Sequence, residues 1–182
     1  MKVISVNIGK KRKVQWKNKT FETGMYKYPV EGSIFLGTED VVNDDVVDRR
    51  YHGGIEKAVY AYGENHYEFW KMKYPELDFN FGMFGENLTV SILNEEDIKV
   101  GSVYQLGEAK IEVTKPREPC VKLGIRFNDV SVVRQFWNTT KSGVYFKVLK
   151  PGKVTKNDVF TLLEKDINAL SIADVYLKKK QT

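Results

Sequence analysis

The chain is poor in the residues that build disulfide frameworks and zinc sites, because it holds one cysteine and two histidines in 182 residues. A single cysteine cannot form an internal disulfide bond, and no spacing of histidine and cysteine matches a zinc site. Apolar runs are also short, and none approaches the roughly 20 residues that a membrane-spanning helix needs. The first residues lack the charged, apolar and small-residue segments of a secretory signal peptide. These absences predict a cytoplasmic protein without membrane contact.

Positive charge is only slightly in excess over negative charge. Lysine and arginine number 29 and aspartate and glutamate 24, which gives a formal net charge of +5. This excess suits an anionic ligand but does not by itself indicate nucleic acid. The basic runs Lys10–Lys13 and Lys178–Lys180 are typical of a solvated turn and a solvated tail. The sequence therefore does not favour nucleic acid as a partner.

Alternation of apolar and polar residues predicts many short strands. Residues 1–8 alternate with the period of a strand, and two strands at 103–106 and 109–114 flank a tight turn. Apolar residues three and four positions apart predict short helices over 65–73, 130–137 and 168–179. The pattern thus predicts a mainly β protein, a β-barrel domain over 1–163 with a few short peripheral helices, and a short C-terminal helical tail over 164–182.

The one cysteine lies in a loop that carries two cations. Arg117 and Lys122 flank Cys120, and Pro116 and Pro119 restrict the backbone that leads to it. Neighbouring positive charge favours the thiolate, which is a better nucleophile and a better soft metal ligand than the thiol. An unpaired cysteine can also be a small buried hydrophobe, but such a residue has little use for adjacent cations. We therefore expect the chemistry of the chain to centre on Cys120.

Two further polar clusters carry chemistry that complements a thiol. The first combines cations with paired glycines, whose N–H groups can approach an oxyanion or a phosphate. Its residues are Arg49, Arg50, His52, Gly53, Gly54 and Lys57. In the second, Gly85 precedes the carboxylate of Glu86 and the amide of Asn87, which can read the polar edge of a heterocycle. Taken alone, the first cluster is equally compatible with an ordinary polar turn, and the second is more typical of such a turn than of a ligand site.

In their order and in their residue types, these clusters resemble the motifs of the MOSC domain, which is named for the C-terminal domain of molybdenum cofactor sulfurase. The matching segments are Asp48–Val59, Phe84–Leu88, Pro116–Leu123 and Gly143–Val148. The resemblance covers about residues 20–163 and is closest to the stand-alone bacterial, YiiM-like branch. It implies a closed β-barrel, a site for the molybdenum cofactor (molybdopterin), and Cys120 as the catalytic residue and molybdenum ligand.

The resemblance also assigns roles to the other two clusters. It implies that the cofactor's phosphate or pterin is bound by Arg49, Arg50, His52, Gly53, Gly54 and Lys57. It implies that the pterin ring is contacted from Gly85, Glu86 and Asn87, while Arg117 and Lys122 support the thiolate.

Related proteins reduce N-hydroxylated bases with electrons from external redox proteins. The resemblance therefore implies a molybdenum-dependent reductase of a small N-hydroxylated substrate, in which the cofactor carries the difficult step. Two other functions stay open. One is a sulfur carrier that holds a persulfide on Cys120 for cofactor or metal–sulfur cluster assembly. The other is a non-catalytic module that binds an anion or nucleic acid, and the sequence leaves open whether the chain forms a homodimer.

Overall fold

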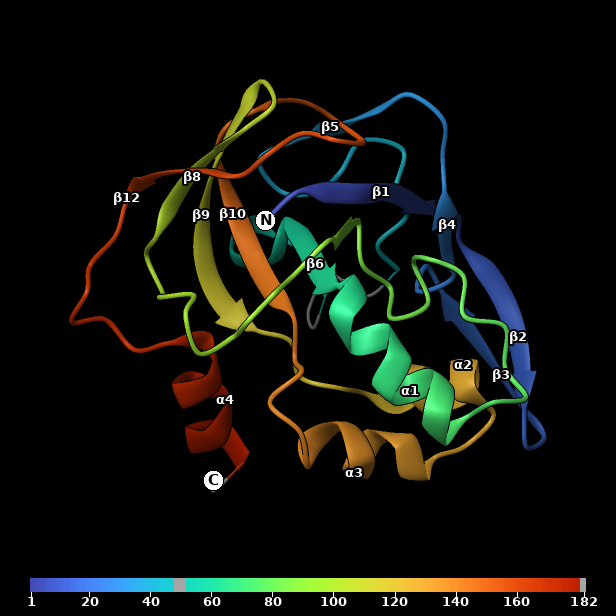
Figure 1. Ribbon diagram of the computed structural model, residues 1–182. Coiled ribbons are helices and arrows are strands. Elements are labelled where there is room, and N and C mark those ends of the chain that lie inside the picture. The colour runs from blue at the N-terminus through green and yellow to red at the C-terminus, as the bar shows by residue number, and fades with distance from the viewer. Residues whose placement is uncertain (48–51, 181–182) are drawn as a thin grey trace.

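A computed structural model describes residues 1–47 and 52–180 (Figure 1). Within these residues the chain forms twelve strands and four α-helices. The strands are β1 (Val3–Gly9), β2 (Arg12–Trp16), β3 (Lys19–Thr23), β4 (Lys27–Pro29), β5 (Ser33–Leu36), β6 (Val59–Gly63), β7 (Leu88–Val90), β8 (Val103–Leu106), β9 (Ala109–Pro116), β10 (Val144–Lys150), β11 (Gly152–Thr155) and β12 (Thr161–Glu164). The helices are α1 (Tyr67–Lys73), α2 (Val121–Phe127), α3 (Ser131–Trp137) and α4 (Ile172–Lys180), with 3-10 turns at Ile55–Lys57 and Glu64–His66.

Eight of the strands form one sheet in the order β12-β8-β9-β10-β6-β7-β1-β4. Neighbouring strands in it are antiparallel, except that β6 and β7 are parallel. β5 pairs with β11 and β2 pairs with β3 in two small sheets. The prediction of a mainly β protein with a few short helices and a C-terminal helix is confirmed.

Closure of the barrel is not confirmed. In residues 1–47 and 52–180 no sheet closes on itself, since no ladder joins β12 to β4 at the two ends of the large sheet. The sheet does curl, because the N–H of Val3 donates to the carbonyl of Asp158 at 2.8 Å and that of Phe160 to Met1 at 3.1 Å. Alternation in a sequence sets which face of a strand is buried but does not determine which edges meet. The boundary between residues 163 and 164 stays a prediction.

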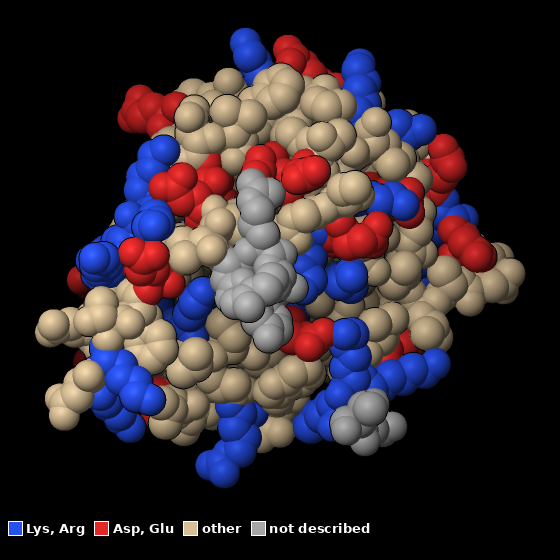
Figure 2. All heavy atoms as spheres, turned by 180° about the vertical axis from the view of Figure 1, so that it is seen from behind, with Lys and Arg blue, Asp and Glu red and all other residues tan. Residues whose placement is uncertain are grey.

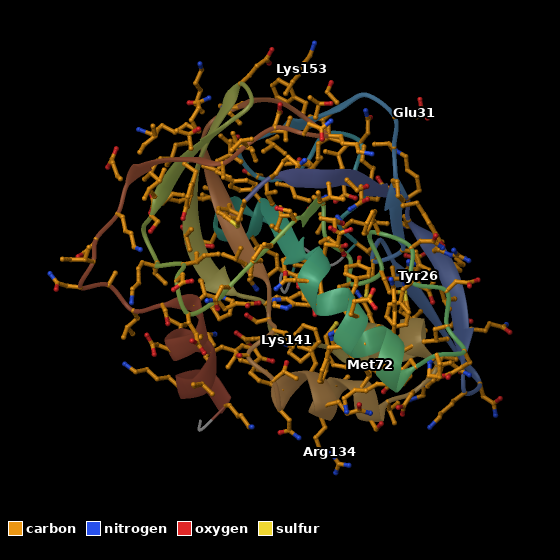
Figure 3. The ribbon with its side chains drawn as sticks, viewed as in Figure 1. Tyr26, Glu31, Met72, Arg134, Lys141 and Lys153 are labelled. Carbon is orange, nitrogen blue, oxygen red and sulfur yellow. The ribbon has the colours of Figure 1, made fainter. Side chains whose placement is uncertain are left out.

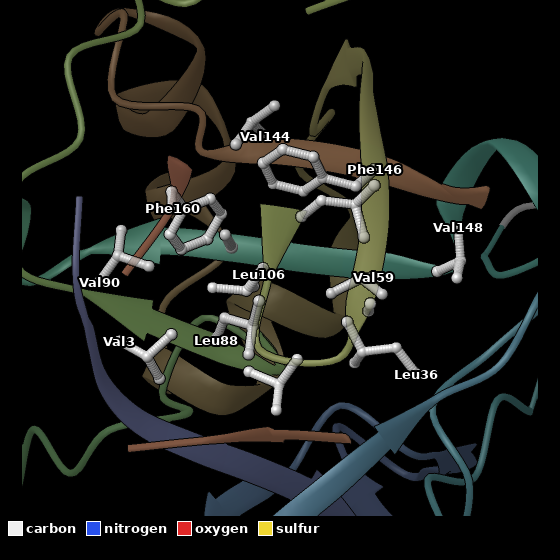
Figure 4. Close-up of a cluster of buried hydrophobic side chains, with 14 of the residues drawn as sticks. Val3, Leu36, Val59, Leu88, Val90, Leu106, Val144, Phe146, Val148 and Phe160 are labelled. Carbon is white, nitrogen blue, oxygen red and sulfur yellow. The ribbon is translucent and has the colours of Figure 1, made fainter. Parts of the chain in front are cut away.

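Strands β6 and β10 are buried on both faces and separate two hydrophobic cores. Val59 and Phe146 point into an aliphatic core inside the curled sheet (Figure 4). Tyr60 and Tyr145 point the opposite way, into an aromatic cluster that the helices cover. Their ring centroids lie 5.0 Å apart. Because side chains alternate along a strand, one pair of strands supplies both the core and a wall of the site described below.

Helices α1, α2 and α3 lie together below the sheet in Figure 1. Trp70 of α1 stacks on Phe136 of α3 with ring centroids 5.6 Å apart, whereas Met72 points to solvent (Figure 3). The predicted helices are thus confirmed with shifted ends. None of the helices in the described part of the chain has the length and apolar content needed to span a membrane.

Helix α2 was not predicted, although it begins directly after Cys120. It carries Gly124 in its middle and has no side-chain hydrogen bond at its N-cap, so the sequence shows none of the usual start signals. Leu123 and Phe127 are buried in the aromatic cluster, and Asn128 ends the helix with a left-handed backbone at φ 53°. Tertiary packing therefore determines this helix more than local propensity does.

Candidate functional site

A pocket lies beside Cys120 and collects segments that are far apart in the sequence. It encloses about 640 Å³, including the part that is open to solvent. The first polar cluster contributes His52, Gly53 and Lys57, and the second contributes Gly85 and Asn87. The cysteine loop contributes Arg117, Cys120 and Lys122. Eight of the predicted site residues therefore meet at one pocket.

The other predicted residues are not part of this described lining. Arg49 and Arg50 lie outside the described residues, so their predicted role stays a prediction. Gly54 has a positive φ of 77° next to Gly53, and a side chain there would meet nothing within 4 Å. Neither Gly54 nor Glu86 is among the residues that line the pocket.

Glu86 is fully buried and its carboxylate is occupied by donors of the chain itself. It accepts hydrogen bonds from the hydroxyl of Tyr67, from the hydroxyl of Thr89 at 2.9 Å and from the N–H of Gly82 at 2.8 Å. Burial raises the pKa of Glu86, and these hydrogen bonds oppose the rise. The carboxylate thus holds together the turn that leads into β7, and its predicted contact with a pterin stays a prediction.

The thiol of Cys120 is partly exposed and has a histidine beside it. Its Sγ lies 3.8 Å from Nε2 of His52. A second hollow of about 840 Å³, again counted with its open part, adjoins the pocket. Cys120, His52 and Tyr145 line both spaces, so the sulfur stands at their boundary.

Arg117 is buried although it carries a charge. The residue is only 4% exposed. Its guanidinium carbon lies 5.2 Å from the ring centroid of Tyr60 and 5.8 Å from that of Phe136. Its Nη1 atom is buried and has no hydrogen-bond partner among the described residues. A buried guanidinium donor without an acceptor is costly, and Arg117 also lines the pocket, where its charge favours an anionic ligand.

Lys27 and Asp44 form a buried ion pair in the pocket wall that the sequence reasoning missed. Asp44 accepts from Nζ of Lys27, from Nδ2 of Asn87 at 2.9 Å and from the N–H of Gly9 at 2.7 Å. Burial lowers the pKa of Lys27, and Asp44 opposes this shift. No local signal in the sequence could reveal this cluster, because the partners of Asp44 are 17, 43 and 35 positions away.

The amide of Asn87 connects this ion pair to β6. Its Oδ1 accepts from the N–H of Tyr60 at 3.3 Å, while its Nδ2 donates to Asp44. Tyr60 in turn donates from its hydroxyl to the carbonyl of Ser142 at 2.8 Å. Asn87 therefore lines the pocket and also links Asp44 to the strand that carries Tyr60.

Tyr60 and Tyr145 were also missed as site residues, although the sequence held a signal for them. Both line the pocket and lie at alternate positions of buried strands, opposite to the aliphatic core. Burial raises the pKa of Tyr60 and of Tyr145, and Arg117 opposes both shifts. The phenols therefore stay protonated at neutral pH and present neutral rings to the guanidinium.

The described lining is positively charged, since Lys27, Lys57, Arg117 and Lys122 outnumber Asp44 and Asp45. Burial, with a smaller contribution from Lys115, lowers the pKa of Lys57. Within the described residues no three His, Cys, Asp or Glu side chains gather as a metal-binding group. The arrangement can hold an anionic ligand next to a thiol, and a metal here would take most of its ligands from that ligand.

Comparison with known families gives the relationship of this chain. Its sequence matches the family model of the MOSC domain over residues 48–161. The chain belongs to the MOSC domain family. This MOSC protein is 36% identical to YflK of Bacillus subtilis over 170 residues, which are 93% of this chain and 76% of YflK. It is 33% identical over 156 residues to a protein of Gibberella moniliformis named Reductase, covering 84% of this chain but 28% of that protein.

A solved structure of a MOSC relative has the same fold. YiiM from Geobacillus stearothermophilus superposes with a TM-score of 0.80 at 31% identity, over 98% of this chain and 83% of that chain. YflK and YiiM are stand-alone MOSC proteins, which confirms the predicted branch of the family.

Proposed function

We propose that this MOSC protein binds a molybdenum cofactor in the pocket through Cys120 and reduces a small N-hydroxylated compound. The observation that carries the proposal is a partly exposed thiol at the edge of a positively charged pocket, which the buried guanidinium-bearing residue Arg117 also lines. The name of the Gibberella relative, Reductase, agrees with this class of reaction.

The residues of the pocket fit an anionic cofactor with a sulfur-ligated metal. Cys120 offers one soft ligand, and the absence of a further ligand group in the described residues suits a metal that is already held by a dithiolene. Arg117 brings a positive charge that favours an anion in the pocket, and Lys57 and Lys122 add positive charge near the sulfur. These residues would hold the cofactor, and when bound it would supply the redox-active metal.

The chain's own residues have the remaining tasks of binding, orientation and proton transfer. A thiol must lose its proton to become a metal ligand, and Nε2 of His52 is close enough to take it. The neutral phenols of Tyr60 and Tyr145 keep Arg117 in place without competing as anions. Electrons would come from an external redox protein, as in other cofactor enzymes of this type. The cytoplasmic location and the homodimer stay predictions.

A reduction assay tests the proposal. Protein loaded with the cofactor is given benzamidoxime as the N-hydroxylated compound and a reduced viologen as electron donor, and benzamidine is measured. We expect turnover in the wild type and in the control Lys13→Ala, which changes an exposed residue of β2. Cys120→Ala should reduce turnover to background. Equal turnover in Cys120→Ala would contradict the proposal.

A sulfur carrier is the second candidate, and the solvent access of Cys120 supports it. A carrier needs a thiol that a donor enzyme can reach and that is stable as a persulfide after transfer. Incubation with a cysteine desulfurase and cysteine, followed by mass spectrometry of the intact chain, should then show one added sulfur atom on Cys120. If no sulfur is added under conditions that load a known carrier, this second candidate is excluded.

A further inference from the structure

The net positive charge of the chain is concentrated in one segment that the function proposed so far does not use. Residues 10–19 include six basic residues and no acidic one, whereas the rest of the chain has 23 basic and 24 acidic residues. The sequence indicated a solvated turn for Lys10–Lys13, but Arg12 and Lys13 belong to β2. The segment includes β2, the turn after it and the first residue of β3. This hairpin therefore carries the whole excess of positive charge.

The hairpin lies apart from the two hydrophobic cores. Among the described residues β2 and β3 pair only with each other, and they lie at the right-hand edge of the molecule in Figure 1. In the view from behind in Figure 2 this side is on the left, where several Lys and Arg side chains project from the surface. Val14 is opposite Phe21 and Trp16 is opposite Lys19, and the three apolar side chains are half-buried without belonging to either core. Packing of the cores therefore does not explain why the hairpin carries them.

The base of the hairpin is held against the rest of the protein. The ring centroid of Tyr26 lies 4.5 Å from the guanidinium carbon of Arg12 and 4.4 Å from that of Arg126 in α2. Lys11 forms an ion pair with Glu22 at 3.1 Å. An isolated two-stranded hairpin is only marginally stable, so these contacts help to fix its orientation. The cations at the base thus have partners within the protein.

The end of the hairpin offers cations beside an aromatic ring. Nζ of Lys17 lies 5.7 Å from the ring centroid of Trp16, and neither Lys17 nor Lys19 forms an ion pair within the described part of the chain. Lys17 and Asn18 form the turn with positive φ angles of 44° and 59°. Asn and Gly are the usual residues at both positions of such a turn, so Lys17 does not serve the turn itself.

We propose that the end of this hairpin binds single-stranded nucleic acid, with a base stacked on Trp16 and phosphates paired with Lys17 and Lys19. A single strand alternates anionic phosphates with flat bases, which matches an aromatic ring next to two cations. An anionic membrane fits less well, because the apolar side chains are half-buried and the tip consists of Lys17 and Asn18. An acidic protein would use the charges but not the ring. The binding depends neither on Cys120 nor on a cofactor.

The test is the fluorescence anisotropy of a fluorescein-labelled strand of twelve thymidine nucleotides, titrated with the full chain at several salt concentrations. We expect a Kd of about 1–100 μM and a slope of log K against log salt of about −1.4, as for two phosphate contacts. Lys17→Glu with Lys19→Glu should weaken binding about tenfold or more. Trp16→Leu should weaken it about fivefold or more without changing the slope, and Trp16→Phe should restore binding because it keeps a ring.

Matched controls separate the hairpin from net charge and from other anionic partners. Lys178→Glu with Lys180→Glu changes the net charge by the same amount in α4, and it should leave binding within about twofold of the wild type. An equal loss in this control, or unchanged binding in Trp16→Leu, would overturn the proposal. Equal affinity for a polyglutamate of twelve residues, or for phosphatidylglycerol vesicles, would also overturn it and assign the hairpin to an acidic protein or to a membrane.

Discussion

The Sγ atom of Cys120 lies 3.8 Å from Nε2 of His52, although the two residues are 68 positions apart in the sequence. The thiol is partly exposed at the junction of two hollows, so a small reagent should reach it without unfolding the chain. We predict that Ellman's reagent labels one thiol per chain in the folded, cofactor-free protein. Labelling that requires denaturant would contradict an open thiol, and Cys120→Ser is the blank.

Substitution of Arg117 separates its ligand role from a stabilising role. The guanidinium is buried and one of its donors has no described partner, so Arg117→Met removes a charge that folding must desolvate and keeps most of the volume. Replacement of buried charges by apolar groups of similar volume is often neutral or stabilising. We predict that the free energy of unfolding of the cofactor-free protein falls by less than about 1 kcal/mol, measured by urea denaturation. Affinity for the anionic cofactor should be lost. A large loss of stability would show that Arg117 is chiefly structural.

In contrast to Arg117, a single substitution in the ion pair between Lys27 and Asp44 should lower the free energy of unfolding strongly. Asp44→Leu leaves the ammonium of Lys27 buried without its counter-charge and should cost about 3–5 kcal/mol of unfolding free energy. The double variant Lys27→Met with Asp44→Leu should recover part of this loss, because no unpaired charge is left. Urea denaturation of both variants measures the difference. If the double variant is less stable than Asp44→Leu, the buried charge is not the cause of the loss.

Glu86 should make stability depend on pH in the acidic range. Burial raises the pKa of Glu86 above its ordinary value of 4.5, so the folded chain holds a proton there that the unfolded chain releases. Its contribution to stability is therefore fully present below about pH 4.5 and is lost as the pH rises through the raised pKa. Glu86→Gln cannot lose this proton. We predict that the wild type loses stability relative to Glu86→Gln as the pH is raised from 4 to 7, and a constant difference would contradict the assignment.

The sequence indicated most of the site because motifs and strand alternation are local signals. The clusters around His52, Asn87 and Cys120 could be recognised as segments, and the fold brings all three to one pocket. Alternation in β6 also places Tyr60 on the face opposite to Val59, but nothing local distinguishes a core side chain from a pocket side chain. The ion pair joins Lys27 and Asp44, which are 17 positions apart in the sequence and meet only in the folded chain. No motif spacing in the sequence could therefore reveal it.

Burial and edge pairing depend on the whole fold, and this limited the predictions for Glu86, for α2 and for closure of the barrel. Glu86 is a polar residue inside a recognised motif, yet its carboxylate faces Tyr67 and Thr89 within the protein. Whether a carboxylate points outward to a ligand or inward to the turn depends on burial, which a motif does not encode. Helix α2 likewise forms because Leu123 and Phe127 pack against the aromatic cluster, and barrel closure depends on edges whose pairing the alternation cannot specify.

The most direct test of the account is the molybdenum and pterin content of protein isolated under reducing conditions from a host that makes the cofactor. Metal is measured by mass spectrometry and pterin by the fluorescence of its oxidised form. The account predicts both in the wild type and in Lys13→Ala, with molybdenum lost from Cys120→Ser. Absence of both from the wild type, or equal molybdenum in Cys120→Ser, would contradict it.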